Sequence, residues 1–192
     1  MEWQSIFKHF ALYGVLISWV FGSWLVWRTR HIDVRTTSEL AVTSKKDYFI
    51  FATGISLAGI FLALCTYGYM RYNLTVPELY YYLYAFALTM QIITAWVPEL
   101  PGKKHLIHWY SSWLLAHFML PLGALLLVEG NYTDRTAQVS GVFQIFGVAI
   151  LVIMVITETW GLHGEKSNKQ VIRAQQVYAV LFQILILARI YV

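Results

Sequence analysis

Six long runs of apolar residues, separated by short polar segments, dominate the pattern of this chain. A helix needs about 20 residues to cross a hydrocarbon core of about 30 Å, which is close to the length of each run. Lipid offers no partner for backbone polar groups, so each run must be helical. The pattern predicts an all-α polytopic membrane protein, one domain over 1–192 with six transmembrane helices, at about 9–27, 48–70, 79–97, 106–128, 137–157 and 174–192.

The composition agrees with a membrane protein. Of the 192 residues, 58% are hydrophobic and 12% are charged, whereas a soluble domain carries about 25% charged residues. The net charge of +4 is small and confined to loops. We therefore expect no nucleic-acid partner, and we expect basic loops to lie beside anionic lipid headgroups. Cys65 is the single cysteine, which excludes an internal disulfide and a multi-cysteine metal site.

Basic residues gather in three of the segments between the spans. The loops 28–47, 98–105 and 159–173 hold ten of the fourteen Lys and Arg residues. The positive-inside rule predicts that these loops are cytoplasmic and that both termini lie outside. Asn73 and Asn131 begin glycosylation acceptor sequences on the predicted outer face, but they lie so close to a span that we expect neither to be modified.

Small residues recur at four-residue spacing in the first span. Gly14, Ser18 and Gly22 form one stripe, and Gly54 and Ala58 repeat the device in the second span. Such a stripe allows the backbone of a neighbouring helix to approach closely. It predicts helix packing, either within the bundle or in a homo- or hetero-oligomer through the first span.

The fourth span begins with a polar cluster. His105 and His108 fall near one another on a helix, and Glu99 precedes them in a proline-bracketed turn. This set can be read as a site for Zn²⁺, although no cofactor is predicted for the chain. Alternatively, His108 activates Ser111 or Ser112 as a nucleophile. A third interpretation is a cluster that caps the helix and meets lipid phosphates.

His117 lies nine residues after His108 and therefore on the opposite face of the same helix. Pro121 leaves the carbonyl of His117 without its helical donor. An ionisable residue at mid-depth is a functional candidate, either as a bond between helices or as a polar anchor in a lipid- or small-molecule-binding cavity. No Asp or Glu falls in the middle of a predicted span, which argues against a proton- or cation-driven carrier. The candidate partners of His117 are Gln91, Thr94, Gln144 and Gln183.

Two segments resemble a known family. Thr37 to Phe51 is similar to the segment that enters the second span in the damage-regulated autophagy modulator-like superfamily. Trp96 to His108 is similar to the turn and histidine pair of that superfamily's prokaryotic relatives, a membrane domain of unknown function. The chain departs from the family pattern at Ala41, where glycine is usual, and at Glu99, where aspartate is commoner. The positions that match the motifs are Ser38, Glu39, Pro98, Glu99, Gly102, His105 and His108.

The resemblance implies a six-span fold and a role connected with lipid. Eukaryotic members of the superfamily are similar to proteins that act in autophagy control, GPI-anchor lipid remodelling and plasma-membrane lipid organisation. We therefore expect a protein that interacts with membrane lipids or organises them. Its polar ligand site would lie at the headgroup level, with His117 and Gln91 as further candidates beside Ser38, Glu39, Glu99 and His108. The alternatives are a lipid-modifying enzyme that uses His105, His108 and Glu99 for metal binding or acid–base catalysis, and a structural subunit of a membrane complex.

Overall fold

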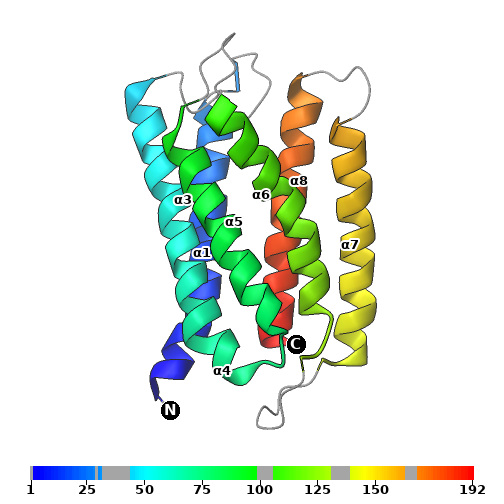
Figure 1. Ribbon diagram of the computed structural model, residues 1–192. Helices are drawn as coiled ribbons and strands as arrows, with labels where there is room; N and C mark the ends of the chain where they lie inside the picture. Colours follow the sequence, from blue (N-terminus) through cyan, green and yellow to red (C-terminus); the bar gives the residue numbers. More distant parts are fainter. Residues whose placement is uncertain (1, 29, 32–43, 99–105, 131–138, 163–167) are drawn as a thin grey trace.

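The structure, a computed structural model, describes residues 2–28, 30–31, 44–98, 106–130, 139–162 and 168–192. Figure 1 shows long helices that lie side by side with roughly parallel axes. The described residues form six long helices, so the predicted all-α bundle and its number of long helices are confirmed. The elements are α1 Glu2–Arg28, α3 Lys45–Cys65, the π-helix η1 Thr66–Met70, α4 Arg71–Asn73, α5 Glu78–Trp96, α6 Leu106–Leu126, α7 Gly141–Leu162 and α8 Asn168–Tyr191.

The length and apolarity of the helices indicate a membrane protein. Four helical stretches are long and apolar enough to cross a bilayer, namely 3–28, 45–73, 141–160 and 170–191. The other two long helices, α5 and α6, are not among these four stretches. Large apolar side chains such as Val142, Ile145 and Ile156 point outward along α7. An outward apolar surface of this kind suits a lipid environment.

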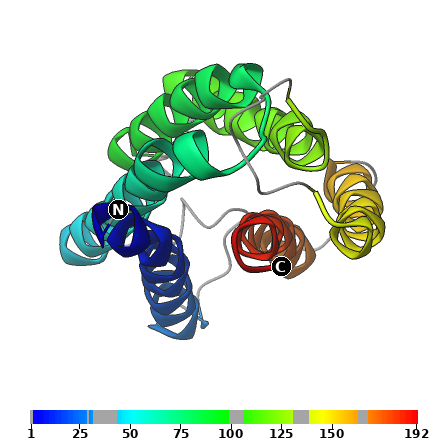
Figure 2. The ribbon, with the colours of Figure 1, turned by 90° about the horizontal axis from the view of Figure 1, so that it is seen from below.

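Consecutive helices form three antiparallel pairs: α1 with α3, α5 with α6, and α7 with α8. Helix α3 also packs against α5, and α8 packs against α6 and α1. Helix α7 stands at the edge of the bundle and packs mainly against α6 and α8, as the view along the helices shows (Figure 2). Both termini lie at one end of the bundle (Figure 1). The described residues that flank the three basic loops lie at the other end.

Local contacts explain how α1 is joined to α3. The hydroxyl of Ser44 accepts a hydrogen bond from the backbone N–H of Asp47 at 3.0 Å and so caps the start of α3. The carboxylate of Asp47 accepts a hydrogen bond from Nε of Arg28 at 2.9 Å. The Asp47 side chain is buried, so this ion pair fixes the end of α1 against the start of α3.

The small-residue stripe of α1 serves contacts within the chain. A methyl group added at Gly14 would lie 2.9 Å from the carbonyl oxygen of Ala58, so α1 and α3 approach closely there. The hydroxyl of Ser18 accepts a hydrogen bond from Nε2 of Gln183 in α8 at 2.9 Å. Gly22 has open space around it. Two of the three residues are therefore used for packing inside the bundle, and an oligomer through this stripe stays a prediction.

The helix ends differ from the predicted spans. Helix α1 begins at Glu2 rather than residue 9, and α8 begins at Asn168 rather than residue 174. Helix α7 covers Gly141–Leu162 in place of 137–157. A hydropathy pattern stops at the first charged residue, whereas backbone hydrogen bonding continues for as long as the helix conformation is favourable. One consequence is that Glu158, which falls outside the predicted fifth span, lies within α7.

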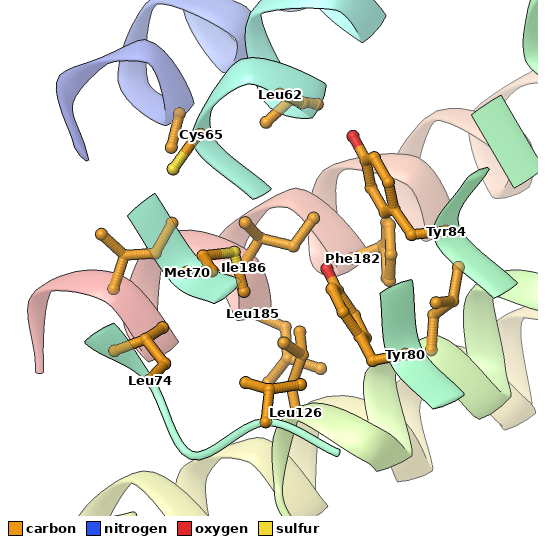
Figure 3. Packing of buried hydrophobic residues seen from close by; sticks show 14 of the residues in the cluster. Leu62, Cys65, Met70, Leu74, Tyr80, Tyr84, Leu126, Phe182, Leu185 and Ile186 are labelled. Carbon is orange, nitrogen blue, oxygen red and sulfur yellow. The ribbon is translucent and has the colours of Figure 1, made fainter. Parts of the chain in front are cut away.

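The second predicted span is not one uniform helix. After Cys65 the chain forms the π-helix η1, in which the N–H of Arg71 reaches back to the carbonyl of Thr66. Such π segments occur often at functional sites. Next to η1 lies the core, where Tyr80 and Tyr84 of α5 stack with ring centroids 5.8 Å apart. Figure 3 shows these rings facing apolar residues of neighbouring helices, among them Leu62, Cys65, Met70, Leu126, Phe182, Leu185 and Ile186.

Candidate functional site

Part of the site predicted at the headgroup level lies outside the described residues, namely Ser38, Glu39, Glu99 and His105. The elements that flank it do meet, because the hydroxyl of Tyr48 at the start of α3 donates to the carbonyl of Trp96 at 2.6 Å. His108 is the member of the predicted metal or acid–base set that the structure describes. That set therefore stays a prediction, and His108 can be examined in detail.

His108 fastens the start of α6 to the end of α5. Its side chain is buried, and Nδ1 lies 2.6 Å from the backbone carbonyl oxygen of Val97. A carbonyl oxygen only accepts, so Nδ1 carries the proton in this contact. Val97 directly follows the last residue of α5. The imidazole thus satisfies one of the carbonyl groups that a helix end leaves without a helical donor.

The serines after His108 bond to their own helix. The hydroxyl of Ser111 donates to the carbonyl of His108 at 3.0 Å and accepts from the hydroxyl of Thr94 at 2.9 Å. The hydroxyl of Ser112 donates to the carbonyl of Trp109 at 3.0 Å. Both hydroxyl protons are thus directed at backbone carbonyls rather than at the imidazole of His108. This arrangement favours a role in joining α5 to α6 over a role in nucleophilic catalysis.

Gln91 also joins helices. Its Nε2 donates to the carbonyl of Ile55 in α3 at 3.0 Å. Gly59 makes room for this amide, because a methyl group at Gly59 would lie 3.0 Å from Nε2. The prediction that Gln91 or Gln183 holds His117 is wrong, since both amides bond elsewhere. These helices carry apolar residues on most of their faces. The hydrophobic periodicity of the sequence therefore does not predict which neighbouring helix a given amide contacts.

His117 meets a carboxylate from another helix. Its Nδ1 lies 2.9 Å from the carbonyl oxygen of Trp113, one turn earlier in α6, and its ring lies tilted against the indole of Trp113 with centroids 4.1 Å apart. The same Nδ1 lies 3.6 Å from Oε1 of Glu158 in α7. The prediction that His108 and His117 face different neighbours is confirmed, because His108 contacts the end of α5 and His117 contacts α7.

Tyr178 of α8 completes this cluster. Its hydroxyl donates to the carbonyl of Ala116 at 2.8 Å and lies 3.4 Å from Oε2 of Glu158. Ala116 lies five residues before Pro121, in the turn where the proline removes a helical donor. Sequence reasoning missed Glu158 and Tyr178. A longer fifth span would have included the carboxylate, but no pattern in the sequence points to the tyrosine.

A groove lies at the terminal end of the bundle, away from the predicted headgroup site. It has a volume of about 540 Å³ and is open to the outside. Helix α1, the last turns of α3, the π-helix η1, α4 and α5 supply its walls. The lining is mostly apolar and aromatic, and consists of Trp3, Gln4, Phe7, Ile60, Ala63, Leu64, Tyr67, Gly68, Tyr72 and Leu88.

Comparison with known proteins identified no relative of this chain. No protein-family model, no curated protein and no solved structure matches the chain. The resemblance to the damage-regulated autophagy modulator-like superfamily therefore stays a prediction. Within the parts of the chain that the structure describes, no three His, Cys, Asp or Glu side chains are grouped so that they could hold a metal ion.

Proposed function

We propose that this chain is an integral membrane protein that binds a membrane phospholipid, with one acyl chain in the groove between α1, α3 and η1. The groove is the observation that carries the proposal. Its volume of about 540 Å³ falls within the range of about 300–1,000 Å³ that is usual for small-molecule sites. Its apolar and aromatic walls match the chemistry of a hydrocarbon chain.

The position of the groove supports a lipid as the occupant. Trp3 and Tyr72 line it and are among the most exposed aromatic side chains of the described residues, at 73% and 62%. Trp and Tyr prefer the boundary between headgroups and acyl chains. A groove bordered by these rings and opening onto an apolar surface would be reached from the bilayer itself.

The backbone of η1 shapes the groove. A methyl group added at Gly68 would lie 2.6 Å from the ring of Phe7, so only glycine allows this ring to pack onto the π-helix. Tyr67, also in η1, directs its hydroxyl to the carbonyl of Tyr81 at 2.6 Å. The polar atom of Tyr67 is thus satisfied inside the protein, and its ring is left to form apolar wall.

Photolabelling tests the proposal. The protein is reconstituted in phosphatidylcholine vesicles that contain a trace of phosphatidylcholine with a diazirine in one acyl chain. We expect labelling to concentrate on groove residues of η1 and the last turns of α3. Ala63→Phe places a ring in the groove and should lower labelling of these peptides several-fold.

The matched control is Ala149→Phe, the same substitution on the exposed surface of α7, which does not line the groove. This variant should label like the unmodified protein in the α3–η1 peptides. Equal labelling of these peptides in all three proteins, or labelling spread evenly over every outward-facing helix, would contradict an acyl-chain site in the groove.

A further inference from the structure

An ion pair lies beside the groove, at the end of the bundle that carries the termini. Arg71 of α4 and Glu78 of α5 face each other across the short connection between these helices, with Nη2 of Arg71 2.5 Å from Oε1 of Glu78. Their side chains are 43% and 39% exposed. Helix α4 lies at the same end as the N-terminus (Figure 1). Both charges can therefore be reached from outside the protein.

Aromatic contacts connect Arg71 to the wall of the groove. Its guanidinium lies over the ring of Tyr81, 5.7 Å from the centroid. The ring of Tyr67, which lines the groove, is 6.2 Å from the ring of Tyr81, and its hydroxyl donates to the carbonyl of Tyr81. Tyr72, the residue after Arg71, also lines the groove. The guanidinium thus lies at the rim of the groove, one ring away from its wall.

The guanidinium of Arg71 is held in place and still has donors to offer. The bond to Glu78 uses Nη2, whereas a guanidinium carries several N–H groups in a rigid fork that suits the oxygen atoms of a phosphate. An exposed ion pair adds little to stability, so joining α4 to α5 does not account fully for this arrangement. Arg71 can therefore bind Glu78 and a phosphate oxygen at the same time.

Two other cations at this end of the bundle are directed elsewhere. Nζ of Lys8 lies over the ring of Tyr191 in α8, 4.8 Å from the centroid. Arg189 is buried, and its Nη2 donates to Oγ1 of Thr75 at 3.2 Å. Of these three cations, Arg71 is the one that contacts a ring packed against the groove wall. The charge that a lipid headgroup meets beside the groove is thus a cation with a carboxylate directly next to it.

From this geometry, and resting on the lipid-binding function proposed above, we propose that the groove selects phospholipids with a zwitterionic headgroup. The phosphate accepts hydrogen bonds from Arg71, and the adjacent ammonium group of the lipid faces the carboxylate of Glu78. Trp3 and Tyr72, which line the groove and are largely exposed, offer ring faces that attract a quaternary ammonium such as choline. A lipid with a phosphate but no cation leaves Glu78 facing a negative charge, and this repulsion provides the specificity.

Photolabelling with different headgroups tests the selection. The same diazirine-bearing acyl chain is placed in phosphatidylcholine, phosphatidylglycerol and diacylglycerol, and each probe is added as a trace to phosphatidylcholine vesicles that contain the protein. We expect the phosphatidylcholine probe to label the α3–η1 peptides several-fold more than either other probe. Arg71→Gln should lower its labelling to the level of diacylglycerol. Glu78→Gln should raise the labelling by phosphatidylglycerol to that by phosphatidylcholine.

The matched controls are Arg173→Gln and Glu129→Gln, the same substitutions at exposed residues that do not line the groove, and both should keep the preference for phosphatidylcholine. A double variant, Arg71→Glu with Glu78→Arg, keeps an ion pair but exchanges its charges. The phosphate is joined to the glycerol whose chain enters the groove, so it would then meet a carboxylate and the preference should be lost. If the pair only joins α4 to α5, the double variant keeps the preference and the proposal is wrong.

The three probes separate headgroup selection from lipid binding as such. Equal labelling of the α3–η1 peptides by all three probes, or stronger labelling by phosphatidylglycerol, would overturn the selection of zwitterionic headgroups and leave the acyl-chain site standing. If no probe labels these peptides above the other outward-facing helices, the acyl-chain site and the headgroup selection both fail.

Discussion

His108 and His117 belong to one helix but lie in different chemical surroundings. His108 is buried and donates to a backbone carbonyl at the end of α5. His117 is 38% exposed and lies beside a carboxyl group of α7. A histidine that completes a helix end contributes mainly to stability, whereas His117 meets a side chain of another helix.

Replacement of His108 by alanine should reduce stability. It removes the donor to the carbonyl of Val97 at 2.6 Å, and an unsatisfied buried acceptor costs about 1–3 kcal/mol. Thermal unfolding of the protein in detergent, followed by circular dichroism, measures the change. His108→Asn, which keeps a side-chain N–H, should recover part of the loss.

Ser112→Ala is the control for this measurement, because the hydroxyl of Ser112 donates to the carbonyl of Trp109 in its own helix. Its effect should stay within about 0.5 kcal/mol, as is usual for surface positions. If His108→Ala is no more harmful than Ser112→Ala, the contact with Val97 does not stabilise the bundle.

The sequence predicted on which face of a helix a residue lies better than it predicted the contacts between helices. Helical periodicity correctly separated His108 from His117, since that depends only on the angle between positions of one helix. The neighbours of His117 depend on how three helices rotate against one another. Helices that are apolar on most faces carry no stripe that fixes this rotation, so Glu158 and Tyr178 could not be predicted as its neighbours.

At the scale of helices, the run lengths were sufficient to predict all six long elements. Their ends were less predictable, because the hydrophobic pattern reports the lipid-facing part and the helix extends beyond it, as in Gly141–Leu162. The π-helix Thr66–Met70 has no signal in the apolar pattern. It matters for function because Tyr67 and Gly68, which line the groove, belong to it.

Gly14 and Gly22 allow a test of helix packing. A methyl group at Gly14 would lie 2.9 Å from the carbonyl oxygen of Ala58 and from the side chain of Leu62. Gly14→Ala should therefore force α1 away from α3, and overpacking of this kind costs about 1–3 kcal/mol. Unfolding in a detergent mixture of increasing denaturing strength measures the difference.

Gly22→Ala is the matched variant, because nothing lies near the added methyl group. Alanine is the better helix former by about 1 kcal/mol, so this variant should be as stable as the unmodified protein or more stable. The packing account fails if the two variants change stability in the same direction by similar amounts.

For the whole molecule, the groove and the cluster of His117, Glu158 and Tyr178 lie in different parts of the bundle. The groove belongs to α1, α3, η1, α4 and α5 at the end that carries the termini. The cluster of His117, Glu158 and Tyr178 belongs to α6, α7 and α8. A change in this cluster should leave the groove intact, so Glu158→Gln should keep the lipid labelling. The lipid proposal requires that the bundle crosses the bilayer.

Thiol labelling in sealed cells tests that requirement most directly. Cys65 is buried and is first replaced by alanine, and single cysteines are then placed at Lys46, Trp160, Glu129 or Val192, which are all exposed. We expect a membrane-impermeant reagent to label Glu129→Cys and Val192→Cys in intact cells, and Lys46→Cys and Trp160→Cys only after lysis. Labelling of all four positions from the same side would contradict a bundle that spans the membrane.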